Sequence, residues 1–364
     1  MIRSWLAAVI RLECPASPAA GDANPAELLR VAQEEGVVAL VHERLQRPEL
    51  ASLVLPGLRE AFAEAALEKA VQSLLRQAEC RCILERLERA GLPVLLLKGS
   101  ALAYWLYASP HLRDCSDIDF LFATREDTDH AAEILVENGY AVPAIAGDLV
   151  TYERTAYRAK DTATYLEADL HWGVGGAPVY GDRLRFEELH AESIPLPALA
   201  PNARGLGPVH AYVHAAIHRA LQLWQGTGNR LKWLLDLHLL GGRFTEKDWE
   251  DLLSVCAERG LCGTCLDGLR GAADAFHTRV PEGVVELLEQ GSRHEPLDLG
   301  RMGNWGYIQR MNLGALPTPG LKFRWLRQRL LPSAGFLRHQ YGEAGGKRGA
   351  LGRYLRKGWR NLRG

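Results

Sequence analysis

Two short stretches decide the fold: Leu95-Leu-Leu-Lys98-Gly99-Ser100 and, after sixteen intervening residues, Asp117-Ile-Asp119-Phe-Leu-Phe122. The first is an apolar run that ends in glycine and serine, which predicts a buried strand followed directly by the opening of a helix. The second alternates acidic and apolar residues, as a half-buried strand does. Residues two apart on a strand share a face, so Asp117 and Asp119 present both carboxylates to one side while Ile118 is buried on the other.

A second acidic strand is predicted further along the chain, at Tyr165-Leu-Glu-Ala-Asp169-Leu-His171-Trp172. Its polar face carries Glu167, Asp169 and His171, and this face can oppose the Asp117 and Asp119 pair. Neighbouring carboxylates repel each other unless a cation lies between them, and Mg²⁺ takes such hard oxygen ligands together with substrate phosphate. A third carboxylate completes the ligand set of a two-metal displacement. The residues therefore predict a Mg²⁺ (or Mn²⁺) site made of Asp117, Asp119 and Asp169.

From Leu92 to Trp172 short apolar runs alternate with helical stretches, which predicts a small mixed sheet covered by helices, an α+β core. The expected strands are Pro93–Leu97, Ile118–Ala123, a weak one at Tyr152–Tyr157, and Tyr165–Trp172. The expected helices are Ala101–Tyr107 and Asp127–Asn138.

Mainly helical regions flank this core. The expected boundaries are a helical N-terminal region at 1–90, the core at 91–175, a proline-rich linker or crossover at 176–208, a helical region at 209–312 and a basic tail at 313–364. In the first region Asn24 and Pro25 predict a helix start and Gly91 predicts a stop. A long helix from Leu58 is expected to need a neighbour along an apolar stripe that includes Phe62, Ala66, Leu67, Val71 and Leu74.

The composition indicates in which compartment of the cell the protein is expected. No run approaches the ~18 apolar residues that a membrane span needs. The seven cysteines are an odd number without framework spacing, which favours reduced thiols and a cytoplasmic location. Residues 321–364 hold twelve Lys and Arg against one acid, so the tail's +11 within a chain of net charge −1 leaves −12 for residues 1–320. The tail is expected to bind an anionic partner or to pair with the acidic body.

The order of these motifs resembles the DNA polymerase beta superfamily of nucleotidyltransferases. More narrowly, it is similar to the poorly characterised bacterial family-5 nucleotidyltransferases, through Leu-Leu-Lys98-Gly99, Arg113 before Ser116-Asp117-Ile-Asp119, Asp169-Leu-His171-Trp172, and Arg230-Leu-Lys-Trp233-Leu-Leu-Asp236. The resemblance implies the polymerase beta fold and the transfer of a nucleoside monophosphate from a nucleoside triphosphate, with ATP expected. It also implies that Asp169 accepts the acceptor's proton and that Gly99 and Ser100 contact the leaving phosphates.

Three basic residues are candidates for nucleotide contacts. Lys98 can reach triphosphate or serve as a solvated strand end. Arg113 is placed for a phosphate, with an ion pair to Asp114 as the alternative. Arg230 is expected on a helix packed beside the site and is the preferred phosphate contact on that helix.

Histidines supply candidates for the acceptor site. His214 and His218 can line an acceptor pocket or form a polar seam between helices. His171 can orient Asp169, contact substrate, or be structural. Helix geometry argues against a zinc site of His210, His214 and His218, because the outer two lie about 12 Å apart along a helix and cannot easily share one ion.

The acceptor is expected to be a hydroxyl. The basic tail helices favour a peptide or protein, while an aminoglycoside-like small molecule and an RNA end stay open. Two alternatives remain: an ATP-dependent kinase that phosphorylates a peptide hydroxyl on the same scaffold, and a non-catalytic module that binds a nucleotide or a partner.

Overall fold

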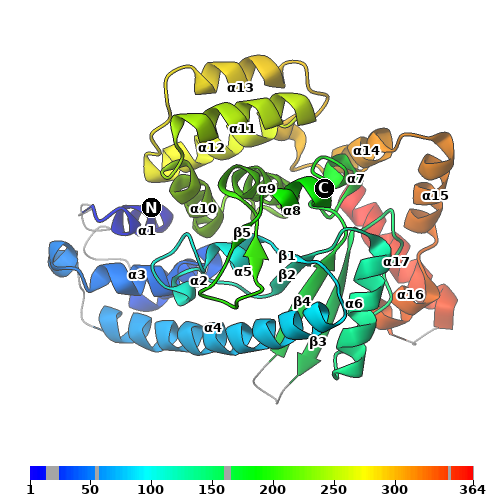
Figure 1. Ribbon diagram of the computed structural model, residues 1–364, viewed down its shortest axis with the longest axis horizontal. Coiled ribbons are helices and arrows are strands. Elements are labelled where there is room, and N and C mark those ends of the chain that lie inside the picture. The colour runs from blue at the N-terminus through cyan, green and yellow to red at the C-terminus, as the bar shows by residue number, and fades with distance from the viewer. Residues whose placement is uncertain (14–23, 54–56, 160–164, 343–345, 364) are drawn as a thin grey trace.

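The computed structural model describes residues 1–13, 24–53, 57–159, 165–342 and 346–363. Within these residues one mixed sheet of six strands is surrounded by helices (Figure 1), which confirms the predicted α+β class. The strands are β1 (Leu95–Leu96), β2 (Ile118–Leu121), β3 (Glu153–Ala159), β4 (Tyr165–His171), β5 (Ile194–Pro195) and β6 (Arg204–Gly205).

The sheet has the order β3-β4-β2-β1-β6-β5. At its centre β2 runs parallel to β4 and antiparallel to β1, and the long strand β3 pairs antiparallel with β4. The two acidic motifs of the sequence therefore lie on adjacent parallel strands. Their separation along the chain is taken up by α6 (Arg125–Glu137) and by β3.

One face of the sheet is a hydrophobic layer under α4 (Leu58–Arg89) and α6. Ile118 and Phe120 of β2 and Ala168 and Leu170 of β4 are buried in this layer. Because side chains alternate along a strand, the residues between them point to the opposite face. Asp119 and Asp169 are the residues between them.

Helices cover the opposite face as well. Leu95, Leu97 and Leu121 pack there into a second core, formed with the helices after the sheet. Those helices are α9 (Pro208–Leu221), α10 (Leu231–Gly241), α11 (Glu246–Arg259), α12 (Cys262–Phe276) and α13 (Val284–Ser292). A capping box begins α11, with Thr245 and Asp248 bonded reciprocally.

The N-terminal region is helical, as expected. It contains α1 (Ile2–Ile10), α2 (Pro25–Glu35), α3 (Val38–Leu45), the 3₁₀ helix η1 (Pro48–Leu53) and α4. Asn24 caps α2, and Pro25 is the first residue of that helix. Gly91, two residues after the end of α4, has a left-handed φ of 68°. The first three helices share a core with Leu231, Leu234 and Leu235 of α10.

The apolar stripe predicted along α4 is only partly buried. Phe62 and Ala66 are buried near one end, and Ile83, Leu84 and Leu87 are buried against the sheet near the other. Between them Leu67, Val71 and Leu74 are 67, 49 and 65% exposed. The helix is 32 residues long, so it bridges two units that each cover one part of it, and its middle stretch is covered by neither.

The proline-rich segment differs from the expected linker. It holds two very short strands, β5 and β6, and β6 pairs in parallel with β1 at Leu96 and Gly205. Two-residue strands show no alternation, which is why the pattern did not reveal them. The other short helices are α5 (Lys98–Leu102), η2 (Pro110–Leu112), α7 (Pro178–Gly181), α8 (Phe186–Ala191) and η3 (Leu223–Gln225).

The basic tail is folded against the rest of the molecule (Figure 1). After η4 (Leu299–Arg301) its helices are α14 (Trp305–Ala315), α15 (Pro319–Leu330), α16 (Ala334–Tyr341) and α17 (Gly346–Arg363). Trp325 and Leu337 are buried, and Arg324 forms an ion pair with Asp148. The basic helices expected in this segment are present as α15, α16 and α17.

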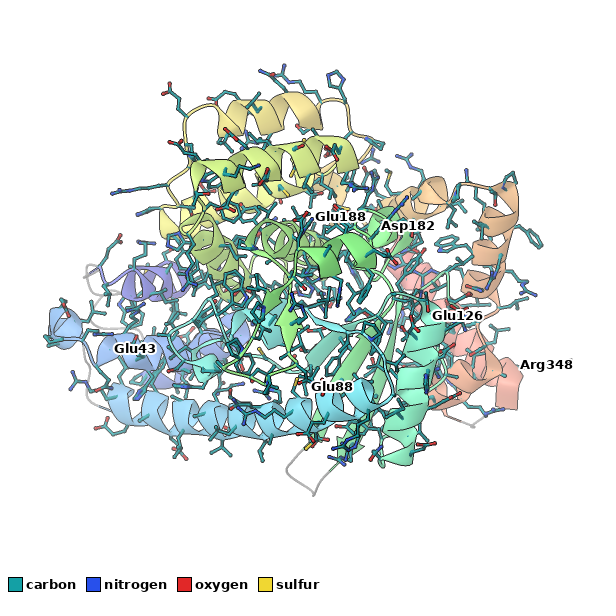
Figure 2. All side chains as sticks on the ribbon, viewed as in Figure 1. Glu43, Glu88, Glu126, Asp182, Glu188 and Arg348 are labelled. Carbon is teal, nitrogen blue, oxygen red and sulfur yellow. The ribbon has the colours of Figure 1, made fainter. Side chains whose placement is uncertain are left out.

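Charged side chains such as Glu88, Glu126 and Arg348 are exposed on the outside of the fold (Figure 2). Buried acidic side chains on the sheet are therefore exceptional, because charge in the interior must be paired. Among the described residues, no helix is both long enough and apolar enough to cross a lipid bilayer.

A matched pair of substitutions on α4 tests which part of this helix is buried. Leu84→Ala removes a side chain that is 2% exposed and is expected to lower the free energy of unfolding by about 3 kcal/mol. Leu74→Ala, on the exposed stretch, is expected to change it by less than about 0.5 kcal/mol. Urea unfolding measures both variants. Equal destabilisation by the two would contradict the placement of α4.

Candidate active site

Three side chains meet on the polar face of the sheet. Asp119, Asp169 and His171 each offer a ligand atom, and these atoms all lie within 4.8 Å of one another. The parallel register of β2 and β4 places Asp119 beside Asp169, and Leu121 beside His171. The predicted convergence of the two acidic strands is thus present in the fold, and this group can hold a metal ion.

Asp119 is 2% exposed and is surrounded by positive groups. Its Oδ1 lies 2.5 Å from Lys98 Nζ and 3.1 Å from His171 Nε2. Burial alone would raise the pKa of Asp119, but the charge of Lys98 and the hydrogen bond with His171 hold it well below its usual range. Asp119 is therefore ionised at neutral pH.

Asp169 has the opposite character. Its Oδ1 accepts a hydrogen bond of 2.7 Å from the Thr155 hydroxyl on the neighbouring strand β3. Burial and the negative charge of Asp119 raise the pKa of Asp169 to about 7. Two adjacent carboxylates thus differ in proton affinity, and Asp169 is the one that can hold a proton near neutrality.

His171 connects this pair to a fourth acid. Its Nε2 faces Asp119, and its Nδ1 lies 3.2 Å from Oε2 of Glu153 on β3. Burial and Lys98 lower the pKa of His171, but the hydrogen bond with Asp119 and the charge of Glu153 outweigh them, so the net shift is upward. The ring is held by acids on both sides, and it orients Asp119 rather than Asp169.

Asp117 lies one residue before β2, outside the group of three but in the same cleft as Asp169 and His171. Ser116 donates a 3.0 Å hydrogen bond to its Oδ1, and burial and the charge of Asp119 raise its pKa. Among the described residues Oδ2 of Asp117, of Asp119 and of Asp169 has no hydrogen-bond donor. Three carboxylates with one uncommitted oxygen each are a donor set that suits a hard divalent cation.

A cleft of about 400 Å³ opens over this face. Lys98, Asp117 and Asp169 line it on the sheet side. The facing walls come from α9, η3, α14 and α15, with Trp224, Trp305, Gln309 and Arg329 among the lining side chains.

Gly99 and Ser100 do not line this cleft, although they were expected to contact phosphate. The Ser100 hydroxyl donates to the carbonyl of Asp117 at 3.3 Å and accepts from the amide of Asp119 at 3.1 Å. Gly99 packs so closely that a Cβ would lie 2.4 Å from Cys115 Sγ. Both residues instead hold α5 against β2, and Lys98, with a left-handed φ of 50°, is the member of the motif that reaches the carboxylates.

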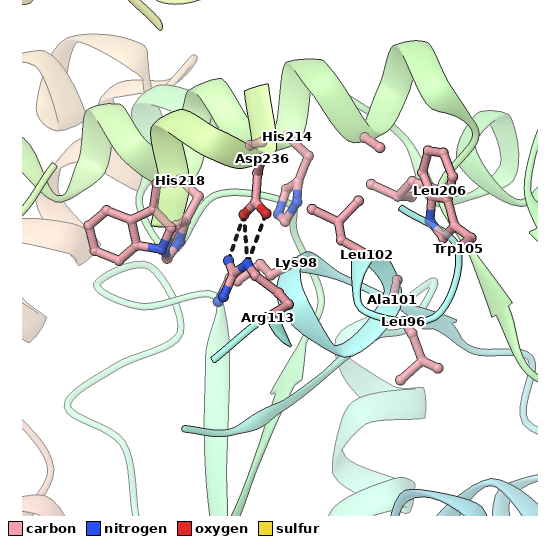
Figure 3. Close-up of a pocket in the computed structure, with 13 residues that line it drawn as sticks. Leu96, Lys98, Ala101, Leu102, Trp105, Arg113, Leu206, His214, His218 and Asp236 are labelled. Carbon is pink, nitrogen blue, oxygen red and sulfur yellow. Dashed lines mark hydrogen bonds and ion pairs between the residues drawn. The ribbon is translucent and has the colours of Figure 1, made fainter. Parts of the chain in front are cut away.

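Arg113, which was expected to contact phosphate, is also absent from the residues that line the cleft. Its guanidinium is buried and binds both oxygens of Asp236 on α10, with Nε at 2.8 Å and Nη2 at 2.6 Å (Figure 3). The Tyr107 hydroxyl donates to the same carboxylate at 2.7 Å. This network joins the segment before β2 to the helical region, so Arg113 anchors the site without entering it.

Arg230 precedes α10, and its guanidinium carbon lies 5.6 Å from the ring centre of Trp233. It is not among the residues that line the cleft, and its expected phosphate contact stays a prediction.

The two α9 histidines that were expected at the acceptor site, His214 and His218, lie in different surroundings. His214 is buried beside a small internal cavity of about 20 Å³ under Lys98 (Figure 3), where burial lowers its pKa to about 3 and keeps it neutral. His218 lines both that cavity and the cleft, with its ring 5.0 Å from Trp233. Of the pair, His218 is the one that lines the cleft.

Sequence reasoning missed two kinds of site residue. Glu153 and Thr155 belong to β3, whose pattern was weak, and only the antiparallel register with β4 shows that they face His171 and Asp169. Trp305, Gln309 and Arg329 lie more than 130 residues beyond the acidic motifs. Nothing in the local sequence predicts that they return to the site.

A mixed sheet whose central parallel strands carry acidic side chains into a cleft is the arrangement expected of enzymes that transfer phosphate-containing groups. The chain belongs to a family of nucleotidyltransferases described as uncharacterised, whose model matches residues 21–277. That match covers the chain from before α2 to the end of α12. No curated protein matches the chain.

The ion pair of Arg113 and Asp236 gives a direct test of the anchoring role. Asp236→Asn leaves a buried guanidinium without its counter-charge and is expected to destabilise the fold by about 3 kcal/mol. The double variant Arg113→Met with Asp236→Leu is expected to regain much of that loss. Arg125→Met, which removes a half-exposed ion pair with Asp148, is the control, with a loss below about 1 kcal/mol.

Thermal and urea unfolding measure these effects, and ATP binding is followed in parallel. An Asp236→Asn protein with the stability of the unchanged chain but weaker ATP binding would assign Arg113 to the nucleotide instead.

Proposed function

We propose that this chain is a Mg²⁺- or Mn²⁺-dependent nucleotidyltransferase that moves a nucleoside monophosphate from a nucleoside triphosphate, ATP in the first instance, to an acceptor hydroxyl. The observation that carries the proposal is the in-register placement of Asp119 and Asp169 on adjacent parallel strands below a cleft. Family membership supports the reaction class. The catalytic residues of the proposal are Asp117, Asp119 and Asp169.

The metal-binding part of the proposal rests on the donor set. Asp119 and Asp169, with Asp117 beside them, would hold the divalent ions through their uncommitted carboxylate oxygens. Bound there, the ions would neutralise charge on the triphosphate and on the group that leaves. His171 and Lys98 keep Asp119 ionised and fix its orientation, which is the usual work of residues around a metal ligand.

Asp169 is proposed to receive the acceptor's proton. Asp169 lines the cleft, so the hydroxyl of an acceptor bound there can come within reach of this carboxylate. The acceptor oxygen forms a bond to the α-phosphorus, and the bond from that phosphorus to the oxygen bridging to the β-phosphate breaks. Pyrophosphate leaves, and the hydroxyl proton passes to the Asp169 carboxylate. Positioning and charge neutralisation supply most of the rate in such transfers.

The acceptor is proposed only as a hydroxyl compound. The basic tail was the reason to favour a peptide or protein, and the structure folds that tail against its own body, with Arg324 paired to Asp148. A peptide and a small molecule are therefore both to be screened. The proposed location is the cytoplasm, where ATP and magnesium are abundant.

Labelled ATP tests the reaction. The protein is incubated with Mg²⁺ or Mn²⁺, with ATP labelled at the α- or the γ-phosphate, and with fractions of a cell extract separated by size. The α-label is expected to move to an acceptor while the γ-label appears in pyrophosphate. Asp119→Asn and Asp169→Asn are each expected to lower the transfer at least about a hundredfold. Glu133→Gln, an exposed acid on α6, is the control.

Two outcomes would contradict nucleotidyl transfer. Movement of the γ-label to the acceptor would assign the chain as a kinase on the same scaffold. Binding of ATP without transfer of either label to any fraction would assign it as a nucleotide-binding module.

A further inference from the structure

Helices α14 and α15 supply one wall of the cleft, although both lie outside residues 21–277, which the family model matches. Trp305 and Gln309 come from α14, and Arg329 comes from α15. Figure 1 shows these two helices following α13 at the side of the molecule where α7 lies. The C-terminal extension of this chain therefore takes part in forming the substrate cleft.

Arg329 differs from the other basic side chain of the cleft in how its charge is paired. Among the described residues that line the cleft, the lysine and arginine side chains are Lys98 and Arg329. Lys98 is already paired with Asp119 at 2.5 Å. Arg329 has no carboxylate partner among the described residues, whereas Arg324 on the same helix has Asp148. Within the described part of the chain, Arg329 is thus a half-buried cation of the cleft without a neutralising acid.

The guanidinium of Arg329 is held in place by neutral groups. Gln309 Oε1 accepts hydrogen bonds from Nε at 3.1 Å and from Nη2 at 2.6 Å. The rings of Trp305 and Trp325 have their centres 5.7 Å from the guanidinium carbon. Nη1 has no hydrogen-bond partner among the described residues. A fixed guanidinium with donors to spare matches phosphate oxygens better than any other side chain does.

We propose that Arg329 binds the β- and γ-phosphates of the nucleoside triphosphate, so that the C-terminal extension provides a substrate-binding residue; this inference rests on the proposed nucleotidyl transfer. The sheet side of the cleft carries Asp117, Asp169 and Glu153, which repel a polyphosphate. A cation on the opposite wall attracts the end of the triphosphate that leaves as pyrophosphate. The α-phosphate then stays next to the carboxylates.

Calorimetry with Mg²⁺ and either ATP or AMP tests the proposal, because AMP lacks both phosphates concerned. Arg329→Gln is expected to weaken ATP binding about tenfold or more and to leave AMP binding unchanged. Arg327→Gln, an exposed arginine on the same helix, is the matched control and is expected to bind both nucleotides as the unchanged protein does. Melting temperatures show whether each variant is folded.

Each result has a distinct meaning. Unchanged ATP affinity in folded Arg329→Gln, or an equal loss for ATP and AMP, would overturn the role of Arg329 while leaving nucleotidyl transfer intact. Failure of the unchanged protein to bind any nucleoside triphosphate would instead refute the proposed function itself. If Arg329→Gln does not fold, Arg329→Lys decides: the ratio of ATP to AMP affinity is expected to fall several-fold, and an unchanged ratio would overturn the proposal.

Discussion

Repulsion between carboxylates held at a fixed distance is the constraint on which the rest of this structure depends. Asp119 and Asp169 are side by side because β2 and β4 pair in parallel register, and neither can move away without breaking that pairing. Lys98 and His171 stabilise the negative charge of Asp119. Burial and the charge of Asp119 together raise the pKa of Asp169 to about 7. A site built in this way favours the arrival of a cation, since a cation relieves strain that the fold imposes.

The two faces of the sheet have different roles. Ile118, Phe120, Ala168 and Leu170 pack under α4 and α6, which makes the scaffold rigid, and the alternate residues are presented to the cleft. On the cleft side the walls come from segments distant in sequence. The buried pair of Arg113 and Asp236 joins the segment before β2 to α10, which packs against α9. The buried arginine thus holds the helical region beside the acidic strands on which the proposed chemistry depends.

Much of this could be predicted from the sequence, for identifiable reasons. Strand alternation is strong in residues 117–122 and 165–172, so the α+β core and the convergence of Asp119 with Asp169 followed from local pattern. What failed depended on tertiary contacts. No local sequence pattern predicts where the side chains of Arg113 and Ser100 lie. The same holds for the contacts of Glu153 and Thr155 with the site, and for the two-residue strands β5 and β6. The position of Arg329 in the cleft likewise depends on how α14 and α15 pack against the rest of the fold, and no short stretch of sequence encodes that packing.

The most direct test of the central claim is to locate manganese in crystals of the protein grown with Mn²⁺ and a non-hydrolysable ATP analogue, by its anomalous scattering. The account predicts a peak within bonding distance, about 2.2 Å, of carboxylate oxygens of both Asp119 and Asp169, with the triphosphate in the same cleft. Manganese and nucleotide bound elsewhere, with these two carboxylates contacting only protein, would contradict it.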